Sequence, residues 1–382
     1  MKSGGLHNVI FISFSQFGVA FSFQFVYIFL PFYVAGMSQH SPQATLLWVG
    51  AIMGSTSLCL ALTSPACGSL AHRFRPKSLY VAGMVIQATL FLVFGFATTL
   101  PGLLILRMLQ GAFGGISTIG LIIISLSSSE EKRAFHFGIF QSGISLGQLI
   151  GPSLGVFAVA AFGYQWAFIS ASLILFASSL FCYMYVTPML PLPSETKSSI
   201  WSTLDKRVLT GAMLLMTATT HLGFLPSVLP QVFERFGLDQ ATALRWAGPI
   251  VMFYTATSMI GTYAWSYLSR RIGVRRMTDF LLLSGVVLPA LLAFTNGLAS
   301  FTIVVMLEMG MVAAIVPLAM SIFAAEPKGN VIGFLNSSRF VAMALGPMLA
   351  TSLVAFANLP TLYLCMSGIT LATYLVYKVF LK

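Results

Sequence analysis

The sequence predicts an all-α polytopic membrane protein whose twelve transmembrane helices form two six-helix bundles. Three observations support this fold class. First, 57% of the 382 residues are hydrophobic and only 8% are charged, whereas a soluble domain carries about a quarter charged residues. Second, apolar runs of about 20 residues, enough to cross a bilayer, recur along the whole chain. Third, Lys and Arg are almost confined to alternate connections between these runs. The lipid bilayer is therefore the expected surroundings, and a cytosolic enzyme or nucleic-acid binder is excluded.

The apolar runs fall into two groups of six. They start near Asn8, Leu46, Ser78, Pro101, Ala134, Gln165, Val208, Arg245, Met277, Ser300, Val331 and Pro360. A polar stretch rich in Pro, Ser and Thr separates the sixth run from the seventh. We therefore expect an N-terminal six-helix bundle at residues 1–187, a cytoplasmic linker at 188–207 and a C-terminal six-helix bundle at 208–382.

The basic residues set the expected orientation. An even number of spans puts both termini and every second connection on one side, and that side holds sixteen of the twenty Lys and Arg residues. The opposite side holds only Arg235 and Arg245. Because positive loops are retained inside the cell, we expect both termini to be cytoplasmic. The short connections are typical of the bacterial cytoplasmic (inner) membrane.

The two halves of the chain also resemble each other. Five residues of the first half recur 195 positions later: Glu131, Gly138, Ser142, Gly151 and Pro152 return as Glu326, Gly333, Ser337, Gly346 and Pro347. A six-span repeat in the same orientation predicts two bundles related by an axis along the membrane normal.

Three local motifs allow a comparison with a known family. The connection after the second run reads Gly-Ser-Leu-Ala-His-Arg-Phe-Arg-Pro-Lys over residues 68–77, the fourth run contains Arg-Met-Leu-Gln-Gly over 107–111, and the fifth contains Gly-Gln-Leu-Ile-Gly-Pro-Ser-Leu-Gly over 147–155. Along its full length the chain resembles the major facilitator superfamily, whose loop motif is Gly-x-Leu-Ala-Asp-Arg-x-Gly-Arg-Lys and whose fourth-helix motif is Arg-x-x-Gln-Gly. The third segment is similar to the Gly-x-x-x-Gly-Pro-x-x-Gly motif of the drug–proton antiporter (12-span) branch.

The resemblance implies conformational roles for the basic loop, which comprises Gly68, His72, Arg73 and Lys77, and for its repeat after the eighth run, Arg270 and Arg271. In the family this loop latches the two bundles through its Asp. Here His72 stands at that position and Arg75 replaces a Gly, so a latch would be weaker or pH-sensitive, because His titrates near neutrality. Retention of positive loops alone would explain the same arginines and lysines.

The fifth run carries a small-residue face. Gly147, Gly151 and Gly155 permit close approach of a neighbouring backbone, and Pro152 removes a backbone hydrogen bond and bends the helix. We expect this face to form a tight seam between the two bundles. The alternative is ordinary small-residue packing, which is common between membrane helices.

Ionisable residues at bilayer depth are costly and are therefore functional candidates. Glu308 lies about 12 Å into the tenth span, at 1.5 Å per residue, where desolvation favours its neutral form and a nearby cation its charged form. We interpret Glu308 as the coupling proton carrier; the alternative is a static salt bridge to Arg339. His221, in the seventh span, could share the proton relay, bind a substrate or serve as a hydrogen-bonded structural residue.

Polar stripes outline an expected substrate cavity, formed by Arg107, Gln110, Gln16, Gln24, Gln141, Gln148, Asn336 and Arg339. Arg107 and Gln110 share one helical face, although Arg107 could instead anchor its helix to backbone carbonyls. Two arginines against Glu308 leave one net positive charge at depth, which favours an anionic or zwitterionic substrate. A stripe of Phe in the first span suits an amphipathic ligand, or is simply a packing surface.

These features predict a secondary active transporter, a proton-coupled exporter of a small organic solute such as a drug, metabolite or siderophore, working by alternating access. A proton-coupled importer of the same fold is the alternative. A membrane-embedded enzyme or sensor is remote, because no clustered nucleophile, base or metal ligands occur within the spans. We expect a monomer whose partners are a small-molecule substrate, protons and lipid, with no metal, cofactor or nucleic acid.

Overall fold

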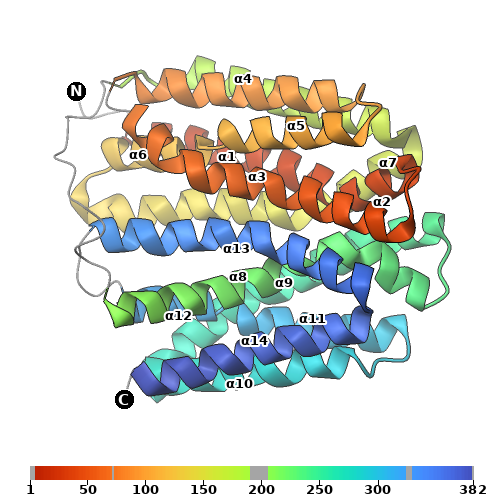
Figure 1. Ribbon diagram of the computed structural model, residues 1–382. Helices are drawn as coiled ribbons and strands as arrows, with labels where there is room; N and C mark the ends of the chain where they lie inside the picture. The colour runs from red at the N-terminus through yellow and green to blue at the C-terminus, as the bar shows by residue number, and fades with distance from the viewer. Residues whose placement is uncertain (1–4, 71–72, 190–204, 324–328, 381–382) are drawn as a thin grey trace.

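The computed structural model describes residues 5–70, 73–189, 205–323 and 329–380, and the regular structure in these ranges is helical. His72 and most of the linker expected at 188–207 lie outside the described residues. Two groups of helices lie side by side, the first from α1 to α7 and the second from α8 to α14 (Figure 1). The start of α1 and the end of α14 lie at the same end of the molecule, which we call the termini end (Figure 1). The opposite end is called the far end.

The first half contains seven α-helices and the short 3-10 helix η1. They are α1 (Gly5–Tyr27), α2 (Leu30–Met37), α3 (Pro42–Leu70), α4 (Pro76–Phe94), α5 (Leu100–Ala112), α6 (Ile116–Ser127), η1 (Glu130–Lys132) and α7 (Arg133–Tyr185). α1 and α2 continue one another, and so do α5 and α6. α7 holds two successive helical segments, because Gly163 has a φ of 81°, a left-handed conformation that only glycine adopts readily.

The second half repeats this plan with separate helices. They are α8 (Lys206–Arg235), α9 (Gln240–Ile272), α10 (Val274–Leu292), α11 (Leu298–Val312), α12 (Ile315–Phe323), α13 (Gly329–Phe356) and α14 (Leu359–Phe380). Asp239 caps α9 by accepting hydrogen bonds from the backbone N–H groups of Ala241 and Thr242. Hydrogen bonding, above all from Thr242, holds the pKa of the Asp239 carboxyl below its usual value. The cap is therefore intact at neutral pH and is lost only as the pH falls through that lowered value.

The described helices are consistent with the twelve expected crossings. α1 with α2, α5 with α6 and α11 with α12 each make one crossing, and α7 makes two. Within the described residues, nine stretches are long and apolar enough to cross a membrane, one of them covering both crossings of α7. α9 and α10 supply the remaining two, and their ends carry arginines such as Arg245 and Arg275.

The two halves touch mainly through two helix pairs, α3 with α13 and α7 with α9, and α8 also contacts α2 and α3. Glycines mark the closest approaches toward the far end. A Cβ added to Gly54 on α3 would lie 2.6 Å from the Ala344 carbonyl oxygen on α13, and one added to Gly248 on α9 would lie 2.9 Å from Ser153 Cα on α7. The rings of Phe32 on α2 and Phe233 on α8 lie 6.4 Å apart at the same end. The halves are therefore packed together at the far end.

The glycine face of α7 packs inside the first half. A Cβ on Gly147 would lie 2.6 Å from the Phe21 backbone nitrogen of α1, one on Gly151 would lie 3.0 Å from the Gln24 side chain, and one on Gly155 would overlap the Phe25 carbonyl. The expected seam of these glycines between the bundles is therefore wrong. Glycines four residues apart form a single stripe, and α1 covers that stripe. The adjoining face of α7, which includes Pro152, Ser153 and Val156, touches α9 of the other half.

Candidate functional site

A buried hydrogen-bonded pair joins two helices of the second half. His221 on α8 and Glu308 on α11 are both 0% exposed, and 2.7 Å separates His221 Nδ1 from Glu308 Oε1. The other ring nitrogen, Nε2, lies 2.8 Å from Thr370 Oγ1 on α14. Thr370 Oγ1 in turn lies 2.9 Å from the Met366 carbonyl oxygen. Three helices thus hold one imidazole in a fixed position.

This chain of contacts can hold one or two protons without moving its heavy atoms. When the Thr370 hydroxyl donates to the Met366 carbonyl, it accepts from His221 Nε2–H, and a second proton is shared between Nδ1 and Glu308. When the Nε2 proton is lost, the Thr370 hydroxyl can rotate and donate to Nε2, while Nδ1–H still donates to the carboxylate. The pair is neutral overall in the first state and carries one negative charge in the second.

The partner of Glu308 is His221, so the expected salt bridge from Glu308 to Arg339 is wrong. Arg339 lies on α13, which packs against α3, α8 and α14 rather than against α11. Its guanidinium donates instead to Asn336 Oδ1, at 3.4 Å on its own helix. Full burial also keeps His221 from contacting a substrate in this arrangement.

Arg107 lies in the first half and is 2% exposed. Its Nη1 donates to Gln110 Oε1 at 3.0 Å, and the Phe94 ring lies 5.8 Å from its guanidinium carbon. Its Nε and Nη2 have no hydrogen-bond partner among the described residues. The expected anchoring of Arg107 to backbone carbonyls is therefore wrong, and so is its expected exposure to a wet cavity in this arrangement.

Gln16 belongs to a network inside the first half instead of lining a cavity. Its amide nitrogen donates to Ser117 Oγ at 2.7 Å, and its amide oxygen accepts from the Tyr80 hydroxyl at 2.8 Å. The expected cavity role of Gln16 is therefore wrong in this arrangement. A related residue that the sequence reasoning missed is Gln87 on α4, which is buried and donates to the Gln110 carbonyl at 2.7 Å. Gln87 could have been found in the sequence as a single amide side chain within an apolar span.

The remaining expected cavity residues differ in their exposure. Gln141 and Asn336 are exposed, whereas Gln24, Gln148 and Arg339 are half-buried. Gln141, Gln148 and Pro152 share one face of α7, and Pro152 marks where that face meets α9 near the far end. The halves are thus in contact beside Pro152, while the same face presents an exposed amide nearer the termini end.

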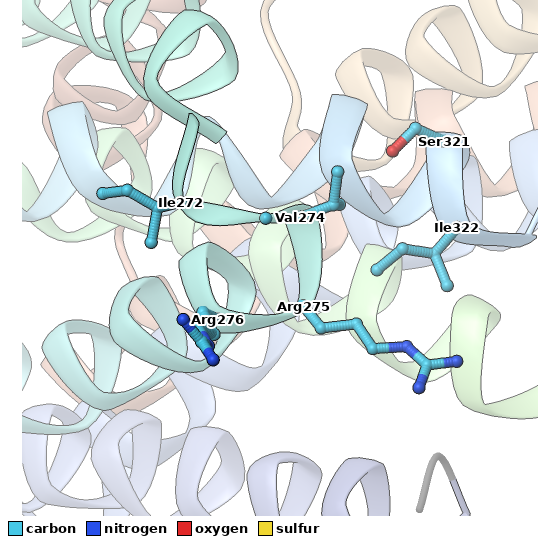
Figure 2. A pocket seen from close by; sticks show the side chains of 7 residues that line it. Ile272, Val274, Arg275, Arg276, Ser321 and Ile322 are labelled. Atoms are coloured by element: carbon cyan, nitrogen blue, oxygen red, sulfur yellow. The ribbon is translucent and has the colours of Figure 1, made fainter. Parts of the chain in front are cut away.

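The basic loops lie at the termini end. Gly68 falls in the last turns of α3, and Arg73, Arg270 and Arg271 are exposed. Lys77 donates to the Tyr183 carbonyl at 2.7 Å and lies 5.3 Å from the Tyr183 ring centre, so it binds within its own half. In the second half, a hollow of about 490 Å³ at this end is lined by the loop around Gly273, by Arg275 and Arg276 and by Ser321 (Figure 2).

Two groups of long apolar helices, in contact at the far end and carrying buried polar groups within the helices, have the architecture of a secondary transporter. The chain belongs to the Major Facilitator Superfamily, whose family model matches residues 12–347. The protein is therefore an integral membrane transporter and not an enzyme.

Similar proteins cover nearly the whole chain. The uncharacterized MFS-type transporter YuxJ of Bacillus subtilis is 27% identical over 354 residues, which is 88% of each chain. Multidrug resistance protein MdtG of Klebsiella pneumoniae is 22% identical over 364 residues, covering 93% of this chain and 88% of that protein. The crystal structure of the human organic anion transporter MFSD10 has a TM-score of 0.72 at 18% identity, covering 97% of this chain and 99% of that one. At this identity it establishes the fold alone.

Proposed function

We propose that the protein is a proton-coupled exporter of small amphipathic organic solutes, with an anionic or zwitterionic group, that works by alternating access. It would sit in a bacterial cytoplasmic membrane with both termini in the cytoplasm. The termini end is then the cytoplasmic end, and the arrangement described above is closed toward the outside.

The buried His221–Glu308 pair carries the proposal of proton coupling. A charge at bilayer depth is expensive unless it is paired or neutralised. This pair can be neutral or carry one negative charge, and the difference is one proton. A change in its surroundings that exposes the pair to the outside favours proton uptake, and exposure to the cytoplasm favours release, because the electrochemical gradient drives protons inward.

Outward transport is supported by the relatives and by the fifth-helix motif. MdtG is named for multidrug resistance, and a membrane transporter confers resistance only by carrying a compound out of the cell. An exporter must load from the cytoplasm, and an arrangement closed at the far end is the one that loads there.

The two arginines support an anionic or zwitterionic substrate. Arg339 is half-buried, on a helix whose Asn336 is exposed near the cytoplasmic end, so it can attract an anionic group from that side. Arg107 keeps two nitrogens without a described partner, and it lies within electrostatic range of Tyr27, whose hydroxyl is 3.5 Å from the Gly223 carbonyl of the other half. As the halves separate at the far end, the free nitrogens of Arg107 can receive the anionic group.

The test of coupling uses inverted membrane vesicles, whose lumen is acidified by respiration. An exporter should accumulate norfloxacin or anilinonaphthalene sulfonate in the lumen against its gradient, and a protonophore should abolish the accumulation. Movement of the probe out of an acidified lumen would identify a proton symporter, which imports in cells. Accumulation that ignores the protonophore would contradict proton coupling.

For Arg107, replacement by Gln should weaken binding of anilinonaphthalene sulfonate about tenfold or more, because a charge-assisted hydrogen bond contributes roughly 1.5–3 kcal/mol. Binding of the cation ethidium should not weaken. Fluorescence titration of the purified protein measures both. Arg245→Gln, which removes an exposed arginine at the far end, is the matched control. Equal losses for the anion and the cation would contradict a charge-specific role.

A further inference from the structure

The surroundings of the His221–Glu308 pair differ on its two sides. Toward the termini end, three buried hydroxyl residues follow one face of α14: Thr370, Thr373 and Tyr377. We call them the hydroxyl column. Toward the far end lie three aromatic residues whose rings neighbour one another, Phe236, Phe301 and Tyr363, which we call the aromatic plug.

The hydroxyl column consists of short steps. At 1.5 Å per residue, Thr373 lies about 4.5 Å along the helix axis from Thr370, and Tyr377 lies about 6 Å further. Thr373 Oγ1 is 2.8 Å from Thr217 Oγ1 on α8, one helical turn from His221. Lys378, the residue that follows Tyr377 on α14, donates to Asp279 Oδ2 at 2.6 Å at the termini end. Asp279 Oδ1 has no hydrogen-bond partner among the described residues.

The aromatic plug separates the pair from the far end by a longer step. Phe301 and Tyr363 lie seven residues before Glu308 and Thr370 on α11 and α14, which is about 10.5 Å along each axis. The Phe301 ring centre is 6.3 Å from that of Tyr363 and 5.8 Å from that of Phe236. Within the described residues, the Tyr363 hydroxyl and Glu308 Oε2 are both buried without a hydrogen-bond partner. Tyr363 lies within electrostatic range of both Glu308 and Arg235 at the far end.

We infer that protons leave the His221–Glu308 pair for the cytoplasm along the hydroxyl column to Asp279, inside the second half, and that they reach the pair from outside past Tyr363 in the aromatic plug. This inference rests on the proposed proton coupling. It separates the proton route from the space between the two halves, where the substrate moves. The proton pair then lies wholly within the second half, on α8 and α11, separate from Arg107 in the first half.

The release step conserves protons and charge. The Nε2–H bond of His221 breaks as an O–H bond forms at Thr370, and the original hydroxyl proton of Thr370 passes on toward Thr373. The proton at Nδ1 stays, so His221 is left neutral beside the Glu308 carboxylate. Water molecules bridging the hydroxyls, as they commonly do between buried polar groups, carry the proton to the Asp279 carboxylate, from which it enters the cytoplasm.

The test compares Thr373→Val with Thr373→Ser in proteoliposomes that contain a trapped pH indicator. Thr373→Val removes the hydroxyl at nearly constant volume, and we expect proton release coupled to norfloxacin transport to slow about tenfold or more. Its solvent deuterium isotope effect should rise, because proton transfer becomes rate-limiting. Thr373→Ser should restore both values. Counterflow of norfloxacin, which needs no net proton movement, should be unchanged and shows that the variant is folded.

Two further variants make the outcome decisive. Thr302→Val removes a hydroxyl on α11 that bonds only its own helix, at the Leu298 carbonyl, and should behave as the unmodified protein. Tyr363→Phe should slow proton uptake from the outside and leave release to the cytoplasm unchanged. If Glu308→Gln stops proton-driven transport while Thr373→Val does not slow it, the hydroxyl column is wrong and the proton coupling stands. If Glu308→Gln has no effect, the proposed coupling itself fails.

Discussion

Replacing Glu308 by Gln should reduce proton-driven accumulation of substrate to the level of protein-free liposomes. The amide can still face His221 Nδ1, so the contact between α8 and α11 survives. However, an amide cannot carry the negative charge that the Glu308 carboxylate holds after the pair has released a proton. The site then holds the same number of protons in both arrangements of the protein. A proton gradient therefore cannot drive transport.

Counterflow distinguishes this loss of coupling from misfolding. In counterflow, labelled norfloxacin exchanges across the membrane down its own gradient, and Glu308→Gln should retain that exchange. Arg339→Gln serves as a control for the rejected salt bridge, because Arg339 does not touch Glu308. At saturating norfloxacin, a protonophore should reduce accumulation by this variant by the same factor as in the unmodified protein. Proton-driven accumulation by Glu308→Gln equal to that of the unmodified protein would contradict the role of the pair.

Replacing Gly248 by Leu should hold the protein open at the far end and stop transport. A Cβ at this position lies 2.9 Å from Ser153 Cα and 3.1 Å from the Pro152 carbonyl oxygen of the other half, and backbone atoms cannot move aside cheaply. Overpacking of this kind costs about 1–3 kcal/mol, which shifts a two-state population about five- to 150-fold. Because the strain exists only when the far end is closed, the open arrangement is favoured.

Spin-label distances across the far end measure this shift. Labels at Gln43 on the first turn of α3 and at Asn358 between α13 and α14 report on opposite halves, in a protein whose native cysteines are replaced by serine. Gly248→Leu should move the distance distribution to longer values. Gly368→Leu is the matched control, because a Cβ on Gly368 meets no atom within 4 Å. An unchanged distribution in Gly248→Leu would show that this contact does not limit closure.

The places of the long helices in the sequence were predictable because each depends on local composition. The starts that the apolar runs predict lie within five residues of the starts of the helices. The largest difference is at α9, where the apolar run begins near Arg245 and the helix begins at Gln240. Asp239 and Arg245 keep this first turn polar, so the hydropathy pattern begins late. Asp239, a residue type that favours the N-cap position, is the sequence signal that marks the true start of α9.

The partners of buried groups were not predictable, because they depend on how helices rotate against each other. Glu308 was identified from its depth alone, but its choice of His221 over Arg339 follows from α8 packing beside α11. The glycines of α7 were identified from their spacing, yet spacing does not reveal which neighbour covers the stripe. The sequence around Gln16 is the same whether its amide faces water in a cavity or bonds the Tyr80 hydroxyl. The sequence pattern therefore does not distinguish a cavity residue from a buried network.

α8 carries both His221 and Phe233, and Pro226 and Pro230 lie between these two residues in the helix. A proline inside a helix has no N–H to donate, so the carbonyls of Leu222 and Pro226 lack their usual helical donors. This stretch of α8 consequently bends at lower cost than the rest of the helix. Under the proposed proton coupling, a displacement of the imidazole on gaining or losing its proton would bend α8 at this segment. Such a bend would shift Phe233, the ring that meets Phe32 of the other half.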